Sequence, residues 1–387
     1  MPNMSRRTLE QFIKDFNETG RVLRPNPDWE EDLRQTVIVT PEIEERVRSY
    51  SRMKKKKVAQ ECHCQEGETR PGVAPLIKMN DGNYIPSFGL GTWLGVDKKT
   101  GELMPVKDNS VQRAVEMAID AGYRHIDTAA VYNTEEQVGA AIQNKIAEFV
   151  VQREDLFITS KLWNDRHRRE DVLPALQETL AKLGLDYLDL FLIHFPISQY
   201  SNGTYYEADF LDTWKGMIDA RGRGLVKSIG VSNFNLTQMK RLLAMSPVKP
   251  AAIQVEVNLN LQQPELIAYC KTNDIAVIGY TPFGSLFHNK AKKDAPPPRT
   301  DEQALLRIAD KYHKTVAQVA LRYIMELGVI PIPKSVTKKR IEQNIEVFDF
   351  QLTQAERNVM KAYNNGYRVI TVDMWKDAPD YPFEHKK

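Results

Sequence analysis

Cysteine is scarce in this sequence of 387 residues, which contains only Cys62, Cys64 and Cys270. Three thiols cannot form the several disulfides that stabilise small secreted domains, so a disulfide framework is excluded and a reducing compartment is expected. No run of 18 or more apolar residues is present either, so no membrane-spanning helix is expected. The first residues lack the apolar stretch of a secretory signal. Together these absences predict a cytosolic protein.

Neither sign of charge is in excess, because the sequence contains 53 Lys and Arg residues and 51 Asp and Glu residues. This balance gives no general attraction to nucleic acids or membrane surfaces. A Rossmann nucleotide site is excluded, since Gly89-Leu90-Gly91 lacks the third glycine and leads into a loop instead of a helix. Cys62-His63-Cys64 places its ligands too close together, with no second pair, to form a tetrahedral metal site. We therefore expect no metal.

The distribution of polar and apolar residues divides the chain into two regions. Residues 1–74 are polar and include the run Lys54–Lys57, which predicts an N-terminal extension. Residues 75–387 alternate short apolar runs with amphipathic stretches, the pattern of successive βα units around a parallel sheet. The chain is 42% hydrophobic, enough to form a sizeable core.

Eight apolar runs, each followed by a helical pattern, predict an α/β fold of the (β/α)8 TIM-barrel type. The predicted strands are Phe88–Trp93, His125–Ala129, Leu156–Leu162, Leu188–Phe195, Val226–Val231, Ala252–Val257, Ile275–Thr281 and Val329–Ile332. The predicted helices are Val111–Asp120, Glu135–Ile142, Val172–Lys182, Phe210–Ala220, Leu236–Ala244, Pro264–Thr272, Glu302–Val319, Lys339–Val347 and Gln354–Tyr363. Asn80-Asp81-Gly82 between Leu76–Met79 and Tyr84–Pro86 predicts a hairpin that precedes the barrel.

Four residues that could carry chemistry follow the predicted strands. These are Asp127, Tyr132, Lys161 and His194. Each has an ordinary structural interpretation when taken alone: a helix cap for Asp127, an extended surface side chain for Lys161 and a core histidine for His194. Because the carboxyl ends of barrel strands surround the active site, their joint occurrence predicts a catalytic group.

The four side chains fit one reaction. A phenol has an ordinary pKa of about 10, so a neighbouring ammonium, held by a carboxylate, is predicted to lower the pKa of Tyr132 and make it a proton donor. His194 could orient a substrate carbonyl. Hydride must come from a nicotinamide cofactor, and its phosphate is expected near Lys334–Arg340, after the last strand and at a helix start. That cluster would otherwise be a solvated helix end.

The sequence resembles the aldo-keto reductases, particularly the aldose reductase-like branch, along nearly all of residues 75–387. The motifs that carry the resemblance, in the family's order, are GLGTW at 89–93, GYRHIDTAAVYNTEEQVG at 122–139, FITSKLW at 157–163, DLFLIHFP at 189–196, SIGVSNF at 228–234, QVE at 254–256 and IPKSVTKKRIEQN at 332–344.

The resemblance implies NADPH as cofactor, with Tyr132 as proton donor, Lys161 and Asp127 as its partners and His194 as orienter. It implies that Ser232, Asn233 and Gln254 bind the nicotinamide carboxamide and that Tyr280 stacks on the ring. The other implied cofactor residues are Gly91, Thr92, Trp93, Gly284, Ser285, Leu286, Lys334, Ser335, Val336, Thr337, Arg340, Gln343 and Asn344.

The implied substrate is a small carbonyl compound, an aldehyde, sugar or steroid-like ketone, and the expected state is a monomer. The substrate-pocket residues implied are Thr92, Trp93, Val131, Trp163, His194, Phe195 and the tail around Ile370–Trp375. Packing at the barrel end is the alternative interpretation of each aromatic residue. The tail sequence VDMWKDAPDYPFE resembles insect members, some of which reduce ecdysteroid ketones.

The chain departs from the family pattern at three places. Val257-Asn258-Leu259 stands where many relatives have Cys-His-Pro, Phe195 replaces the tryptophan that usually follows the histidine, and the tail lacks a cysteine found in some relatives. None of these positions belongs to the predicted catalytic group. The first two could reshape the pocket, and the tail puts aldose-like specificity in doubt.

The N-terminal extension has no counterpart in the family. Leu9, Phe12, Ile13 and Phe16 predict one apolar helical face, and the segment resembles the helix-turn-helix start of transposon-derived proteins. Its mixed charge argues against DNA binding. Three functions therefore stay open: a carbonyl reductase, a non-catalytic nucleotide-binding barrel, and a DNA-binding chimaera, which a salt-dependent interaction of residues 1–74 with DNA would support.

Overall fold

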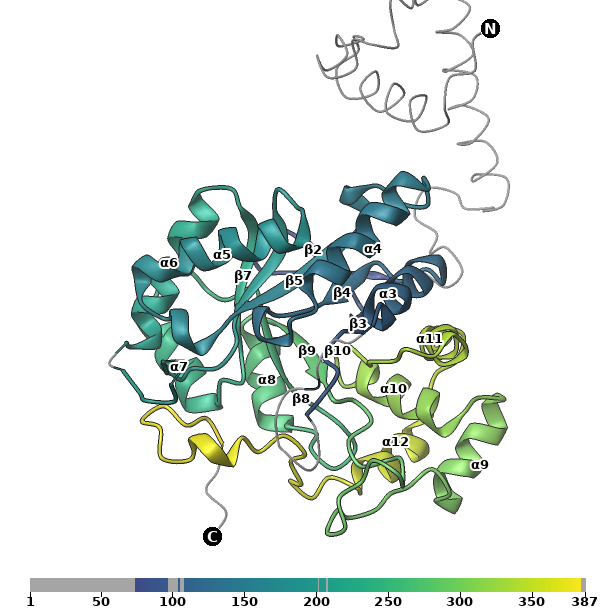
Figure 1. Ribbon diagram of the computed structural model, residues 1–387. Helices are drawn as coiled ribbons and strands as arrows, with labels where there is room; N and C mark the ends of the chain where they lie inside the picture. Colours follow the sequence, from purple (N-terminus) through teal and green to yellow (C-terminus); the bar gives the residue numbers. More distant parts are fainter. Residues whose placement is uncertain (1–73, 97–103, 105–107, 201, 207, 384–387) are drawn as a thin grey trace, which may run out of the picture. The chain divides into compact units, whose positions relative to one another are not determined.

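The structure is a computed structural model that describes residues 74–96, 104, 108–200, 202–206 and 208–383 (Figure 1). Eight parallel strands form one sheet in the order β10-β9-β8-β7-β6-β5-β4-β3, so every strand lies beside its neighbour in the sequence. The strands are β3 (Leu90–Gly91), β4 (His125–Asp127), β5 (Phe157–Leu162), β6 (Leu188–Ile193), β7 (Val226–Ser232), β8 (Ala252–Glu256), β9 (Ala276–Tyr280) and β10 (Val329–Pro331).

The first and last strands meet and close the barrel. The backbone N–H of Gly89 donates to Pro331 O at 3.1 Å, and that of Gly91 donates to Pro333 O at 3.2 Å. A Cβ atom at Gly91 would lie 2.9 Å from Ile332 O, so this close approach of two backbones requires glycine. The predicted (β/α)8 fold is confirmed.

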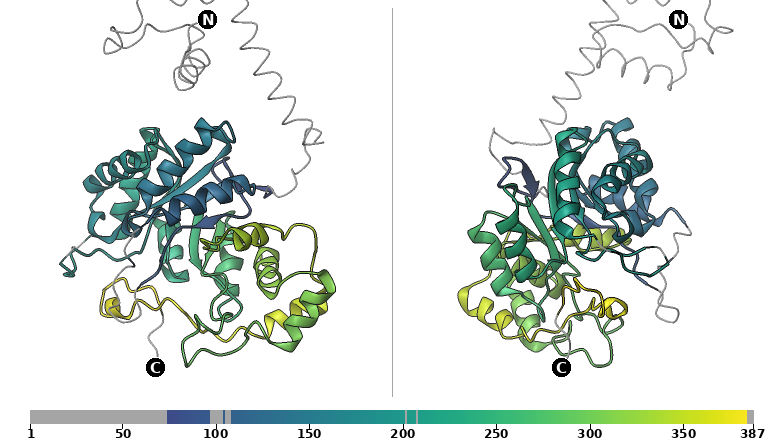
Figure 2. Two further views of the ribbon diagram at one scale, coloured as in Figure 1. Left: turned by 45° about the vertical axis from the view of Figure 1, so that its right-hand side comes forward. Right: turned by 90° about the vertical axis from the view of Figure 1, so that its left-hand side faces the viewer.

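Helices surround the strands in each of the views in Figure 2. They are α3 (Ser110–Asp120), α4 (Glu135–Ala147), α5 (Arg169–Leu183), α6 (Phe210–Gly222), α7 (Leu236–Met245), α8 (Pro264–Thr272), α9 (Gln303–Tyr312), α10 (Val316–Glu326), α11 (Lys338–Ile345) and α12 (Gln354–Lys361). Short 3₁₀ helices are η2 (Ala130–Tyr132), η3 (Arg153–Asp155), η4 (Asn164–Arg166) and η5 (Asp373–Trp375).

The prediction of one helix over Glu302–Val319 is wrong, because the structure has α9 and α10 there. His313 ends α9 with a left-handed conformation at φ 54°. Thr315 then begins α10 with a reciprocal capping box, in which its hydroxyl oxygen accepts from the Gln318 backbone N–H and the Gln318 side chain accepts from the Thr315 N–H. These local hydrogen bonds stabilise a new helix start inside an otherwise helical pattern.

A hairpin of β1 (Leu76–Lys78) and β2 (Tyr84–Pro86) lies at the amino-terminal end of the barrel. Asn80 Nδ2 donates to Pro250 O at 2.8 Å, just before β8, and Asn83 Nδ2 donates to Ser228 Oγ at 3.0 Å in β7. Met79 and Ile85 belong to a buried apolar cluster with side chains from the strands. The predicted hairpin cap is therefore present, and it lies at the end of the barrel opposite to the carboxyl ends of the strands.

The predictions for the N-terminal extension, including the apolar face from Leu9 to Phe16 and Cys62-His63-Cys64, lie outside the described residues. The predicted boundary at residue 74 therefore stays a prediction. Within the described part of the chain, no helix has the length and apolar character needed to cross a bilayer.

Candidate active site

The four predicted catalytic residues lie together at the carboxyl end of the barrel. Asp127 is the last residue of β4, Lys161 is in β5, and His194 directly follows β6. Tyr132 ends the 3₁₀ helix η2 in the loop after β4. Because parallel strands end at one rim, residues from different βα units meet there.

Lys161 is the centre of this group, and its side chain is fully buried. Its Nζ lies 2.7 Å from Asp127 Oδ1, 2.9 Å from Thr128 O and 3.4 Å from the Tyr132 hydroxyl oxygen. An ammonium has three N–H donors, so three acceptors fix its position. The ion pair therefore sits directly beside the phenol, as the tuning role predicted from the sequence requires.

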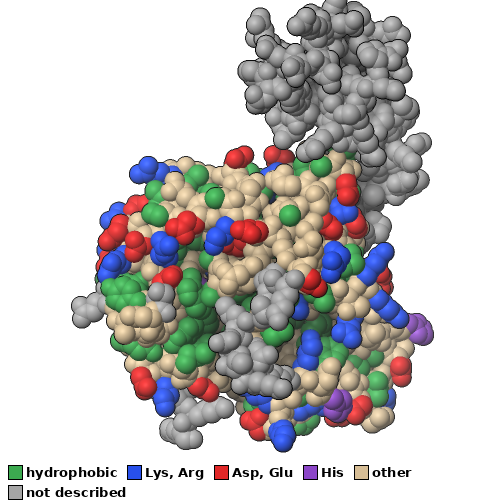
Figure 3. Space-filling model, viewed as in Figure 1, with side chains coloured by type: hydrophobic (Ala, Val, Ile, Leu, Met, Phe, Trp, Pro, Cys, Tyr) green, Lys and Arg blue, Asp and Glu red, His purple; other side chains and the backbone are tan. Residues whose placement is uncertain are grey.

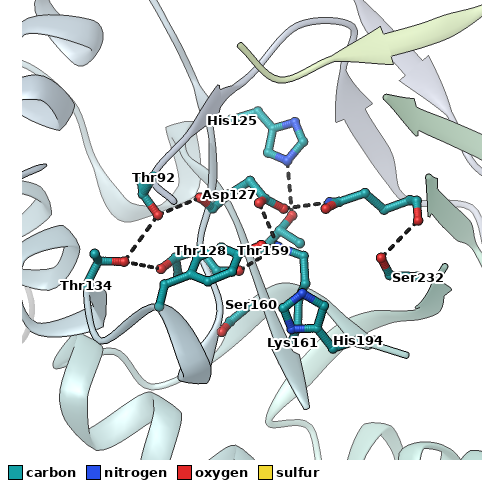
Figure 4. A network of polar contacts seen from close by, with 12 residues as sticks. Thr92, His125, Asp127, Thr128, Thr134, Thr159, Ser160, Lys161, His194 and Ser232 are labelled. Carbon is teal, nitrogen blue, oxygen red and sulfur yellow. Dashed lines mark hydrogen bonds and ion pairs between the residues drawn. The ribbon is translucent and has the colours of Figure 1, made fainter. Parts of the chain in front are cut away.

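Further hydrogen bonds hold Asp127 in place. Gln254 Nε2 donates to Asp127 Oδ2 at 2.7 Å, and the Thr92 hydroxyl donates to Asp127 O at 2.9 Å. Figure 4 shows Thr92, Thr134 and Thr128 in a chain of hydroxyl contacts on one side of Asp127. Both carboxylate oxygens thus have a partner, which rigidifies the ion pair.

The predicted lowering of the Tyr132 pKa is not what the structure gives. Burial raises the pKa of Tyr132 well above its ordinary value, and the Asp127 carboxylate raises it further. The physical reason is that Lys161 is already paired with Asp127, so the two charges largely cancel at the phenol while its enclosure disfavours a phenolate. Burial also raises the pKa of Asp127 and lowers that of Lys161, and their 2.7 Å contact opposes both shifts.

His194 is a neutral imidazole at the same rim. Burial lowers its pKa well below the ordinary value, and the charge of Lys161 lowers it further. Its Nδ1 atom is buried without a hydrogen-bond partner among the described residues. The ring lies edge-on to Tyr132 with centroids 5.5 Å apart. Tyr132 and His194 therefore lie close enough to contact one small group.

A second polar group lies at the ends of β7, β8 and β9. Ser232 Oγ donates to Gln254 O at 2.9 Å, and the Tyr280 hydroxyl donates to Asn233 Oδ1 at 2.6 Å. Asn233 Nδ2 donates to His194 O at 2.9 Å, and its backbone has φ 60°. The four residues predicted to bind the nicotinamide are thus brought together, although Gln254 also contacts Asp127.

Aromatic side chains line the rim next to this group. Trp93 stacks on Tyr132 with centroids 6.2 Å apart, and Trp163 lies edge-on to His194 at 5.2 Å. Phe195 stacks on His194 at 5.3 Å, and Trp375 of the tail contacts Phe195 at 4.9 Å. Val131, also predicted for the pocket, is half-buried next to Tyr132. These side chains form an apolar wall around the polar groups of Tyr132 and His194.

The residues predicted to bind phosphate and adenine occupy two places. Gly91 and Thr92 share a small cavity with Lys334, Ser335 and Val336. Thr337 precedes α11, while Arg340, Gln343 and Asn344 lie on it. On the face in Figure 3, Lys and Arg side chains gather over the region of α3 and α11.

The segment Gly284–Leu286 is separate from this cavity. Ser285 is 3% exposed and Leu286 2% exposed, and Leu286 packs in an apolar cluster with α9 and α10. Their predicted cofactor contacts therefore rest on the resemblance and stay a prediction.

Two contacts could not be predicted from motif positions. The Thr128 carbonyl that accepts from Lys161 is a backbone atom, so no side chain signals it. Glu256 belongs to the QVE motif, but the motif does not indicate that its side chain is fully buried and binds the tail. The described residues hold no group of three or more His, Cys, Asp or Glu side chains that could bind a metal ion.

Comparison with known proteins agrees with the motifs. The model of the family described as Aldo/keto reductase family matches residues 87–365. The chain is 52% identical over 309 residues to aldo-keto reductase AKR2E4 of Bombyx mori, covering 80% of this chain and 98% of that protein. It is 40% identical over 320 residues to human aldo-keto reductase family 1 member C2, covering 79% and 97%.

Solved structures show the same similarity. The crystal structure of Bombyx mori AKR2E4 in complex with NADP matches with a TM-score of 0.77 and 51% identity, covering 80% of this chain and 99% of that chain. The structure of AKR2E5 complexed with NADPH matches with a TM-score of 0.78 and 44% identity, covering 80% and 94%. The resemblance to insect members is consistent with the silkworm relatives. The chain belongs to the aldo/keto reductase family.

Proposed function

We propose that this protein reduces aldehydes and ketones to alcohols with NADPH and that Tyr132 donates the proton. The observation that carries the proposal is the position of Lys161 Nζ, which lies 2.7 Å from Asp127 Oδ1 and 3.4 Å from the Tyr132 hydroxyl oxygen. Family membership supports carbonyl reduction in general. The role of Tyr132 rests on this geometry and on the motif match.

NADPH supplies a hydride when bound, and the residues of this chain handle the proton. The substrate oxygen becomes basic as hydride arrives at the carbonyl carbon, and the Tyr132 hydroxyl gives it a proton. The resulting phenolate lies beside the Lys161 ammonium, which Asp127 holds in place. General acid catalysis of this kind contributes about 10²–10⁴-fold.

The raised pKa of Tyr132 is compatible with this role. It keeps the phenol protonated until a strongly basic alkoxide-like oxygen is present. Neutral His194 can hydrogen-bond the carbonyl oxygen without competing as an acid, because its pKa is far below its ordinary value. The aromatic wall of Trp93, Trp163 and Phe195 excludes water, which strengthens these electrostatic interactions.

The residues present fit a nicotinamide dinucleotide. Ser232, Asn233 and Gln254 offer hydroxyl and amide groups at adjacent strand ends, and Tyr280 has its ring held through its hydroxyl bond to Asn233. Relatives crystallised with NADP or NADPH support the choice of cofactor. For the 2′-phosphate we propose Lys334, Ser335, Thr337 and Arg340, since guanidinium and ammonium groups bind phosphate strongly.

Replacing Arg340 by Ala is expected to raise KM for NADPH about tenfold or more, as a charge-assisted contact of about 1.5–3 kcal/mol is lost. KM for NADH should change little, because NADH lacks the 2′-phosphate. Steady-state kinetics with each cofactor measures the difference. An equal effect on both cofactors would place Arg340 outside the 2′-phosphate site. Arg307→Ala, in α9, serves as a surface control.

The reduction rate is expected to vary little with pH. The raised pKa of Tyr132 and the lowered pKa of His194 keep both groups neutral from about pH 6 to 8. We therefore expect kcat for reduction to change less than about threefold over that range, whereas alcohol oxidation, which needs the phenolate, should become faster as pH rises. A tenfold fall of reduction kcat per pH unit near neutrality would contradict a high Tyr132 pKa.

A panel of sugars, aliphatic aldehydes and ketosteroids, with NADPH consumption as the measurement, tests the activity itself. Tight NADPH binding without turnover of any of these would favour the nucleotide-binding barrel instead. The cytosolic location and the monomeric state expected from the sequence stay predictions.

A further inference from the structure

Glu256 carries a buried carboxylate that the proposed reaction does not use. It ends β8, two residues after Gln254 on the same face of the strand, and its side chain is fully buried. Its Oε1 accepts from the Val369 backbone N–H at 2.8 Å and from Asn258 Nδ2 at 3.0 Å, and its Oε2 accepts from the Ile370 N–H at 2.9 Å. Burying a carboxylate is costly unless such bonds compensate it.

These bonds join parts of the chain that are far apart in the sequence. Val369 and Ile370 begin the C-terminal segment, which Figure 1 shows in yellow, running from α12 past α8 towards α7. Each of the two carboxylate oxygens accepts from a different one of two successive amides. The contact therefore fixes the direction of the backbone as well as its position. A neutral amide side chain could not reproduce this, since it has only one acceptor oxygen.

The segment is attached again further on. Gln238 Nε2 donates to Asp380 O at 3.0 Å, and Asn235 Nδ2 donates to Pro382 O at 3.2 Å, both from the start of α7. Between the two attachments lies Trp375, 8% exposed, whose ring packs 4.9 Å from Phe195 and 5.7 Å from Trp163. Both of those rings contact His194.

The backbone between Glu256's partners and Trp375 is strained. Val372 has φ 45° and ψ 44°, a left-handed conformation that is costly for a β-branched residue. Strain of this kind persists only where surrounding contacts impose it. The hydrogen bond from Ile370 to Glu256 lies two residues before Val372, so it can impose the left-handed conformation there.

We propose that Glu256 is a positioning residue that holds the C-terminal segment so that Trp375 closes the apolar side of the substrate site. It thereby determines affinity for bulky carbonyl substrates. This inference rests on the proposed function of the site. Glu256 acts through Trp375 and does not touch the reacting atoms.

The test compares Glu256→Gln with the wild type on 2-naphthaldehyde, which is large and aromatic, and on propanal. In the variant we expect KM for 2-naphthaldehyde to rise about tenfold, with kcat for both substrates and KM for propanal changing less than about threefold. Glu326→Gln is the control, because the Glu326 side chain is 8% exposed and accepts a backbone N–H, that of Leu352 at 2.9 Å, together with the guanidinium groups of Arg322 and Arg357, away from the site. The control should leave both substrates unaffected.

Trp375→Ala provides a second arm. Alone it should raise KM for 2-naphthaldehyde to a similar extent, and adding Glu256→Gln to it should have little further effect, because both changes act through one contact. Additive effects, or an equal loss of kcat on both substrates, would overturn the proposal. If Glu256→Gln does not fold, Glu256→Asp keeps the charge but shortens the side chain and should give the same KM change.

Hydrogen exchange gives a readout that is independent of turnover. The amides of Val369 and Ile370 should exchange at least tenfold faster in Glu256→Gln than in the wild type, and unchanged protection would overturn the anchor. A wild-type protein that turns over no carbonyl would refute the proposed function, while the exchange measurement would still decide whether Glu256 holds the segment.

Discussion

Tyr132→Phe is expected to lower kcat for carbonyl reduction by about 10²–10⁴-fold, the range that general acid catalysis contributes. The change removes only the hydroxyl that lies 3.4 Å from Lys161 Nζ. The ring, its stacking on Trp93 and the cofactor residues on β7 to β9 are retained, so Kd for NADPH should change less than about threefold. Stopped-flow or steady-state NADPH oxidation measures kcat, and fluorescence titration measures Kd for NADPH.

Tyr323→Phe is the matched control. Tyr323 lies in α10, and its hydroxyl donates to Gln262 Oε1 at 2.9 Å in a region away from the predicted catalytic group. Its loss should cost about 1 kcal/mol of unfolding free energy and leave turnover unchanged. Full activity in Tyr132→Phe would remove Tyr132 from the mechanism.

Lys161→Met is expected to affect both stability and turnover. It leaves the Asp127 carboxylate buried with no countercharge, and breaking such a pair costs about 3–5 kcal/mol. Turnover should fall by at least about 10²-fold, because the phenolate formed by proton donation loses its stabilising charge. Urea unfolding and kcat are measured on the same preparation.

The double variant Lys161→Met with Asp127→Asn separates the two effects. Without a buried charge it should recover most of the lost unfolding free energy, since the amide introduced at position 127 would still have Gln254 as a neighbour. Turnover should remain low. Recovery of activity together with stability would show that the ion pair only maintains the fold.

The barrel could be predicted from the sequence because each βα unit has its own pattern of apolar residues, and because parallel strands must be joined by crossover connections. The prediction from the sequence failed at the break between α9 and α10, where the capping residues Thr315 and Gln318 also fit a continuous helix. It placed Asp127, Lys161 and His194 correctly because strand ends converge in this fold. The direction of the Tyr132 pKa was wrong because burial and the cancelling of Lys161 by Asp127 depend on three-dimensional contacts.

Glu256 illustrates what sequence motifs do not carry. It lies in the QVE motif, but two of its partners are backbone amides more than 110 positions later in the chain. Every residue except proline has a backbone N–H, so the identity of a residue does not indicate that its amide donates to a carboxylate. Only the path of the C-terminal segment across the barrel brings these amides to the Glu256 carboxylate.

The joint between β3 and β10 has a consequence for how the barrel opens. Pro331 and Pro333 have no N–H, so they can only accept, and the amides of Gly89 and Gly91 carry the hydrogen bonds across the joint. Deuterium exchange at the amides of Gly89 and Gly91 therefore reports opening of the ring at this joint. Thr92 and Lys334 lie on opposite sides of it, so a nucleotide bound to both would hold the ring shut and raise the melting temperature in proportion to the logarithm of its concentration.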